Sequence, residues 1–288
     1  MRRCPAKRWD NDARGKSVYE TLTDQEWNEV DRIWEQLEDG AIAEAREGIL
    51  ALLEQRGPHP DLRVLEAAIA IEDGHAEQAL LALRDAEASA DPALFFQLRA
   101  VARFNMVEVE TARSDAEQAL AIRPEMPESH ALLSRIADFV GDREAAREHA
   151  RMAFELDPEG FPLPLDVGDD DFDRLVEASL GELPEPVRER LDEIPLVVDP
   201  MPAREILIAE HPPFPPDILG LFVGRHLLAR SHSDLPESPG TIHLFRRNLL
   251  RVCQDREELA REVRVTVQHE VGHLLGLDED DLEAWGLA

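Results

Sequence analysis

The hydrophobic and polar positions of residues 24–160 follow a helical period, in segments that are separated by turn residues and prolines. Because proline lacks the amide hydrogen and crowds the preceding turn, each of these prolines is expected to close a helical unit. They are Pro60, Pro92, Pro124 and Pro158. Between them the pattern predicts two amphipathic helices joined by a short turn.

An internal repeat underlies this pattern. A turn residue is followed five positions later by alanine, in the pairs Gly40 and Ala45, Gly74 and Ala79, Val107 and Ala112, and Gly141 and Ala146. Successive turn residues are 34, 33 and 34 positions apart. Two helices packed closely as a hairpin leave room only for a small side chain where they cross. The spacing therefore predicts four helical hairpins.

The phrases GHAEQALLAL, DAEQALAIRP and GDREAAREHARMAFELDP make this region similar to the tetratricopeptide repeat family. It departs from the family pattern at Val107, where glycine is expected, and in lacking most of the bulky aromatic positions. The resemblance implies a solenoid whose concave face binds a peptide or a protein partner. A spacer or dimerisation element is the alternative. His75, His130 and His149 are expected to be solvated or packed side chains.

Residues 161–169 lie in a stretch rich in proline, glycine and aspartate, which is typical of a linker. Beyond it, FDRLVEASL and PEPVRERLDEI favour short helices, and the β-branched runs IPLVVDP, ILGLFVG and TIHLFRR favour strands. We therefore expect a tail at 1–23, a helical-repeat domain at 24–160, a linker at 161–169 and a second domain at 170–288. The fold class is an all-α solenoid followed by a small α+β domain, with a sheet of three or four strands packed on helices.

A long amphipathic helix is predicted from about Arg256 to Leu275. Asp255 can cap its free amides, and Glu258 three residues later completes a capping box. One apolar stripe repeats at intervals of three to four residues and is expected to face a core. It consists of Leu259, Val263, Val267, Val271 and Leu274.

His269, Glu270 and His273 give this helix the HExxH spacing. Two imidazoles four residues apart share a helix face and can bind one metal ion. Glu270 is placed to take a proton from water on that metal, which is the arrangement of zinc-dependent peptide hydrolysis. The alternative is a chance match on a helix that carries solvated histidines.

A zinc site needs a third protein ligand, and Gly276 permits the backbone to leave the helix and turn back. Glu279 is the first choice, because it stands ten residues after His269, the third-ligand position of the extended pattern HExxHxxGxxH. Asp278 and Asp280 are alternatives. Asp281 and Glu283 complete the acidic candidates near the carboxyl end.

The stretch TIHLFRRNLLRVCQDREELAREVRVTVQHEVGHLLGLDEDDLEAWG, with ILGLFVG upstream, is similar to the minimal zincin-like metallopeptidases of bacteria. The resemblance implies a compact zincin fold and Zn²⁺ bound by His269 and His273. It also implies that Glu270 is catalytic and that an acidic third ligand follows the glycine. The substrate would be a protein or a peptide, and the strand TIHLFRR is the expected edge along which an extended substrate lies.

The charge of the chain narrows its partners. The formal net charge is −30, from 61 acidic and 31 basic residues, which disfavours nucleic acid and anionic membrane surfaces. The basic N-terminal stretch lacks the apolar run of a secretory signal, and no segment is long and apolar enough to span a membrane. A cytoplasmic protein is expected. Lys7 and Lys16 are the only lysines beside many arginines, a composition typical of GC-rich bacteria.

Cys4 and Cys253 form no CxxC arrangement, so neither a disulfide framework nor a cysteine zinc site is predicted, and Cys253 is expected to be buried. The only tyrosine, Tyr19, precedes the repeats and cannot assist from the second domain. Among the candidates for stabilising an oxyanion are the side chains of His243, Arg246 and Arg247. Each of these has a structural role as its simpler alternative, as do His211, His226 and His232.

The sequence thus favours a cytoplasmic zinc metallopeptidase whose helical repeats recruit protein substrates. Two alternatives stay open. One is a non-catalytic, zinc-binding repeat adaptor, and the other is hydrolysis of a non-peptide amide by the same metal chemistry.

Overall fold

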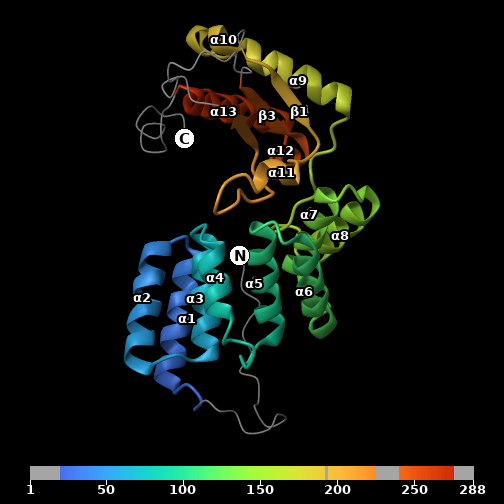
Figure 1. The fold of residues 1–288 in the computed structure, drawn as a ribbon. Coiled ribbons are helices and arrows are strands. Elements are labelled where there is room, and N and C mark those ends of the chain that lie inside the picture. The colour runs from blue at the N-terminus through green and yellow to red at the C-terminus, as the bar shows by residue number, and fades with distance from the viewer. Residues whose placement is uncertain (1–19, 192–193, 225–239, 276–288) are drawn as a thin grey trace. The chain divides into compact units, whose positions relative to one another are not determined.

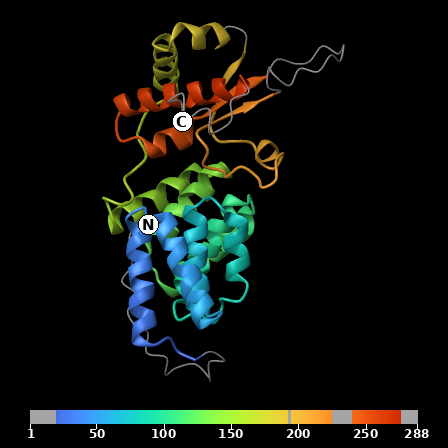
Figure 2. The same cartoon turned by 90° about the vertical axis from the view of Figure 1, so that its left-hand side faces the viewer.

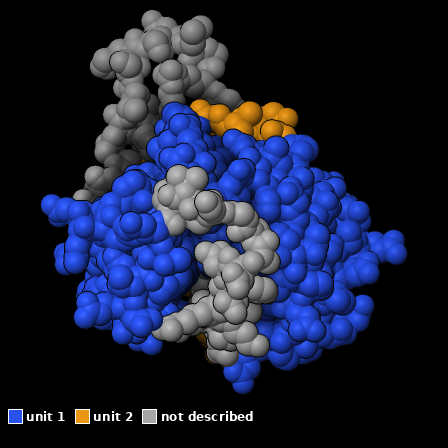
Figure 3. All heavy atoms as spheres, turned by 90° about the horizontal axis from the view of Figure 1, so that it is seen from below, with its two compact units in different colours: residues 1–161, 210–215 blue, residues 162–209, 216–288 orange. Residues whose placement is uncertain are grey.

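The computed structural model describes residues 20–191, 194–224 and 240–275 (Figure 1). The chain divides into two compact units, coloured separately in Figure 3. The first comprises residues 1–161 and 210–215, and the second comprises residues 162–209 and 216–288.

The first unit consists of helical hairpins, as the sequence predicted. Its helices are α1 (Asp24–Glu38), α2 (Ile42–Arg56), α3 (Pro60–Glu72), α4 (Ala76–Leu83), α5 (Pro92–Asn105), α6 (Val109–Ile122), α7 (Pro127–Phe139) and α8 (Arg143–Leu156). They pack as consecutive antiparallel neighbours (Figures 1 and 2). The four repeated alanines are all buried, as expected of small side chains between closely packed helices. The tetratricopeptide identity of the repeats stays a prediction.

Pro124 and Pro158 follow the ends of α6 and α8 closely, as expected, but the other two prolines act differently. Pro60 and Pro92 are the first residues of α3 and α5 and do not close the preceding helices. Proline suits the first helical position because its missing amide hydrogen would have no partner there and its φ is already helical.

The turn inside each hairpin needs a left-handed backbone. Gly40, Gly74 and Gly141 have φ of 77°, 77° and 83°, and Val107 has the same conformation, with φ of 61°. A β-branched residue in this region is strained by about 1–2 kcal/mol. The Val107 side chain is 1% exposed, so its burial offsets that strain.

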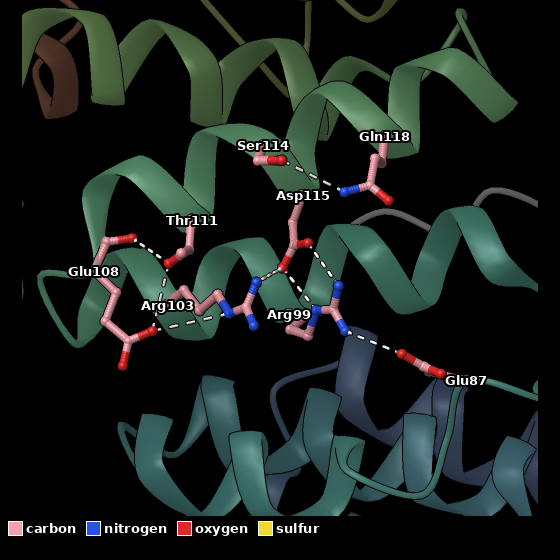
Figure 4. Close-up of polar contacts among 8 residues, drawn as sticks. All are labelled: Glu87, Arg99, Arg103, Glu108, Thr111, Ser114, Asp115 and Gln118. Atoms are coloured by element: carbon pink, nitrogen blue, oxygen red, sulfur yellow. Dashed lines mark hydrogen bonds and ion pairs between the residues drawn. The ribbon is translucent and has the colours of Figure 1, made fainter.

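A buried ionic cluster joins α5 to α6 (Figure 4). The carboxylate of Asp115, a residue 1% exposed, accepts two hydrogen bonds from Arg99 and one from Arg103, all at 2.7 Å. Arg99 also lies over the rings of Phe95 and Phe96, at 4.8 and 5.1 Å from their centroids. The cluster fixes the two helices relative to one another inside one hairpin.

The second unit is a small α+β domain. Its elements are α9 (Asp169–Gly181), α10 (Glu185–Leu191), β1 (Leu196–Asp199), α11 (Arg204–Leu207), β2 (Gly220–Val223), β3 (Thr241–Phe245), α12 (Arg246–Val252) and α13 (Arg256–Leu274). The described strands form one sheet in the order β1-β3-β2, with β1 parallel and β2 antiparallel to β3. The predicted α+β class is confirmed.

This strand order corrects one expectation. TIHLFRR was expected to provide an edge for a substrate, but its strand, β3, lies between β1 and β2. The two arginines of that phrase are not in a strand either, since they begin α12. Its first turn follows β3 without any Gly or Pro to mark the change, so the local pattern gave no signal of it.

The core of this unit lies between the sheet and α13. Ile242 and Leu244 of β3 are fully buried against the apolar stripe of that helix. Cys253 belongs to the same core, as predicted. Its burial, aided by the negative charge of Glu262, raises the pKa of the thiol to about 12, so it stays protonated and unreactive at neutral pH.

Replacing Gly74 with alanine should destabilise the repeat unit by about 1 kcal/mol, because the Cβ meets no clash but the backbone is left-handed. Gly74→Asn is the matched control, since asparagine tolerates this conformation and should recover part of the loss. Urea unfolding followed by circular dichroism measures both. Equal stability of Gly74→Ala and wild type would contradict the expectation.

Asp115→Asn should destabilise the same unit by about 2–3 kcal/mol, because it removes the buried charge and points an amide donor at arginine donors. Glu87→Gln is the control. Glu87 lies 3.7 Å from Arg99, but its side chain is 77% exposed, so a change within about 0.5 kcal/mol is expected. Both variants are compared by urea unfolding, and similar losses in the two would refute the special role of Asp115.

Candidate metal and proton-transfer site

The helix that carries the HExxH residues begins where the sequence predicted. The side chain of Asp255 accepts a hydrogen bond from the Glu258 amide at 2.8 Å. The Glu258 carboxylate accepts in return from the amide of Gln254, at 2.6 Å, one residue before the cap. This variant of the capping box fixes the start of α13 and hence the register of all its side chains.

The apolar stripe then fixes the rotation of the helix. Leu259, Val263 and Val267 are 0% exposed and Val271 is 2% exposed, all within the core of the second unit. Each residue advances about 100° around a helix, so the neighbouring face, which carries His269 and His273, is set by this packing. The helix ends at Leu274, one residue earlier than expected.

The two histidines converge as a metal pair would. Their Nε2 atoms lie 3.0 Å apart, with ring centroids separated by 4.6 Å and planes at 87°. Two nitrogens bound to one tetrahedral zinc ion at the usual bond lengths lie about 3.3 Å apart. The pair therefore fits a single zinc ion with an adjustment of a few tenths of an ångström.

Glu270 turns toward the sheet. It is 5% exposed, and its Oε2 atom accepts a hydrogen bond from the backbone N–H of Phe222 at 2.6 Å. A buried carboxylate needs such a partner, because its charged form has lost most of its water. Phe222 lies in β2, an outer strand of the described sheet. This hydrogen bond therefore connects α13 to that strand.

The residues predicted as the third metal ligand lie outside the part of the chain that the structure describes. This holds for Glu279, for Asp278 and Asp280, and for Gly276, which was expected to end the helix. Among residues 20–191, 194–224 and 240–275, no group of three or more metal-binding side chains could hold an ion. Glu279 therefore stays a prediction. Gly272 within the motif is buried.

Two of the side chains that were candidates for stabilising an oxyanion contact other groups. Nδ1 of His243 lies 2.8 Å from an oxygen of Asp199, and the alternation of β3 puts this side chain on the face opposite α13. Arg246 forms an ion pair with Asp169 at 2.8 Å, and its side chain is only 10% exposed. His226 and His232 lie outside the described residues. For His243 and Arg246 these contacts support the structural alternative.

A second histidine pair lies in the repeats. His130 and His149 approach with their Nδ1 atoms 3.1 Å apart. Burial is the main cause that lowers the pKa of both imidazoles, so both favour the neutral form. They are packed side chains, as the sequence suggested.

The sequence did not predict that the backbone of β2 donates a hydrogen bond to Glu270. Phe222 contributes only its backbone amide, which no motif can reveal. The signal that was present is Gly220, because an isolated glycine inside a strand often marks the close approach of another element.

Comparison with known families agrees with this geometry. Residues 191–287, about a third of the chain, match the family model of zincin-like metallopeptidases. The match spans the three strands, α13 and the predicted third ligand. The prediction that an all-helical region precedes a zincin-like part is confirmed. No curated protein is significantly similar to this chain. Within its described residues, no helix is long and apolar enough to cross a membrane.

Proposed function

We propose that the second unit is a zinc-dependent peptidase, with His269 and His273 as zinc ligands and Glu270 as general base. The observation that carries this proposal is the convergence of the two Nε2 atoms at 3.0 Å on a helix inside the zincin-like match. Glu279 is proposed as the third ligand, and a carboxylate oxygen is an acceptable donor to zinc.

Zinc bound there would polarise a peptide carbonyl and make a nearby water molecule more acidic. Glu270 would accept the proton of that water and later donate it to the leaving amine. Its position next to His269 in the motif supports this role, and the hydrogen bond of one oxygen to the β2 backbone limits the positions that the carboxylate can take.

The edge of β2 is the proposed place for an extended peptide. Since β3 is central, only an outer strand can pair with a substrate by its backbone. Of the two outer strands, β2 is the one that Glu270 contacts, so a peptide beside it would lie near the general base. The Phe222 amide donates to Glu270, so such a peptide would have to pair with the other backbone groups of this edge.

Glu270→Gln should abolish proton transfer and lower peptide cleavage by on the order of 10²–10⁴ while zinc remains bound. His273→Ala should lose both zinc and cleavage. Glu257→Gln is the matched control on the same helix, since that side chain is 88% exposed and should leave both properties unchanged. Unfolded casein fragments analysed by mass spectrometry, together with metal analysis, provide the readouts.

Cleavage by Glu270→Gln at the wild-type rate would remove the proposal, as would the absence of zinc from pure wild-type protein. A non-catalytic adaptor gives a different result. Its zinc would stabilise the fold, so a chelator would lower the melting temperature while wild type cleaves nothing.

We further infer that the helical repeats recruit protein substrates. Support comes from the stacked hairpins, an architecture that commonly presents an extended binding surface, and from exposed apolar side chains such as Leu50, Leu81 and Ile122.

Recruitment predicts that a protein substrate has a lower KM than a short peptide containing the same cleavage site, while kcat is similar for both. Steady-state kinetics with the full chain measures this difference. Equal KM values for the two substrates would argue against recruitment.

A further inference from the structure

The strand β2 approaches the helix α13 closely at Gly220. A Cβ atom added at Gly220 would lie 2.5 Å from Cγ2 of Thr266 and 3.1 Å from the backbone oxygen of His243. Thr266 is 7% exposed and β-branched, so its methyl group has little freedom to move. Any side chain at position 220 would therefore push the strand away from the helix.

The register of the sheet shows which way the amide of Phe222 points. The amide of Phe245 donates to the carbonyl of Leu219 at 2.8 Å, so these two residues form a hydrogen-bonded pair. Such pairs alternate along an antiparallel ladder. Phe222, opposite Ile242, is therefore in a non-hydrogen-bonded pair, and its N–H points away from β3.

This outward amide is the donor to Glu270. The donor and acceptor atoms are 2.6 Å apart, which is a short hydrogen bond. The same added Cβ at Gly220 would lie 3.4 Å from Cγ of Glu270, so the glycine and the carboxylate are immediate neighbours. A shift of β2 by about 1 Å would break the bond, because hydrogen bonds weaken steeply beyond their normal length.

We propose that Gly220 is a positioning residue: by admitting β2 close to Thr266, it lets the Phe222 backbone amide fix the position of the Glu270 carboxylate. The inference rests on the proposed peptidase function for its catalytic consequence. The amide fixes one carboxylate oxygen, and the fixed oxygen sets the direction in which the other can accept a proton. The residue that positions Glu270 is therefore Gly220, on a strand about 50 residues earlier in the chain.

Gly220→Ala tests the close approach. It should lower kcat by about 10- to 100-fold with little change in KM or bound zinc, because the base is misplaced while the ligands stay in position. The second readout needs no substrate. Exchange of the Phe222 amide hydrogen with deuterium, followed by NMR, should become about tenfold faster or more. The amides of Ile242 and Phe245 should keep their protection and so show that the sheet is intact.

Thr266→Ser provides the rescue, since it removes the methyl group that the new Cβ would meet. Gly220→Ala with Thr266→Ser should regain most of the kcat and of the Phe222 protection, and the single Thr266→Ser variant supplies the reference for the cycle. No rescue of either quantity would overturn the steric argument.

Phe222→Pro removes the donor itself and covers the case in which Gly220→Ala fails to fold. Proline is tolerated here because this N–H takes no part in the ladder. Phe222→Leu is the matched control, which loses the ring but keeps the amide. The proline variant should lose kcat with zinc retained, and the leucine variant should retain kcat to within a few-fold.

The outcomes separate the two proposals. If Phe222→Pro or Gly220→Ala retains full kcat, the positioning role is wrong and the peptidase stands. If wild type cleaves nothing, the peptidase proposal fails, yet the exchange experiment still decides whether Gly220 controls the contact with Glu270. Unchanged exchange at Phe222 in both Gly220→Ala and Glu270→Ala would refute that contact.

Discussion

The rotation of α13 is the constraint on which the candidate site depends. Four residues at four-residue spacing, from Leu259 to Val271, fill the core beneath the sheet and leave the helix one orientation. Rotating α13 about its axis by one residue would move every side chain by about 100° and expose this stripe. The cost would be about 1.5–3 kcal/mol for each buried aliphatic side chain. The direction of His269, Glu270 and His273 is therefore set by apolar packing and needs no metal to establish it.

The polar side chains of this helix are placed at different depths, which suits their proposed roles. His269 and His273 are only partly buried, whereas Glu270 is 5% exposed. A buried carboxylate is costly unless it is hydrogen-bonded. The Phe222 amide supplies a bond that an edge strand would otherwise make with water. This contact thus gives a partner to two groups, an outward-facing amide and a buried carboxyl group.

The sequence predicted what depends on local signals. Asp255 and the apolar period located α13 to within one residue at its end, and the alanine spacing located the helical hairpins. The sequence did not predict the strand order, because the position of β3 between β1 and β2 depends on contacts between distant segments. For the same reason the motif indicated Glu270 but not its partner, since a backbone amide leaves no trace in residue types.

Val107 shows why spacing is a better guide to repeats than residue identity. The hairpin turn requires a left-handed backbone, which glycine adopts freely. Valine adopts it at a cost of about 1–2 kcal/mol, and full burial of its side chain contributes about 1.5–3 kcal/mol in return. Those two quantities nearly balance, so the turn can keep its geometry without glycine. What the repeat conserves at this position is therefore a backbone conformation, and the 33- and 34-residue steps detect it where a search for glycine fails.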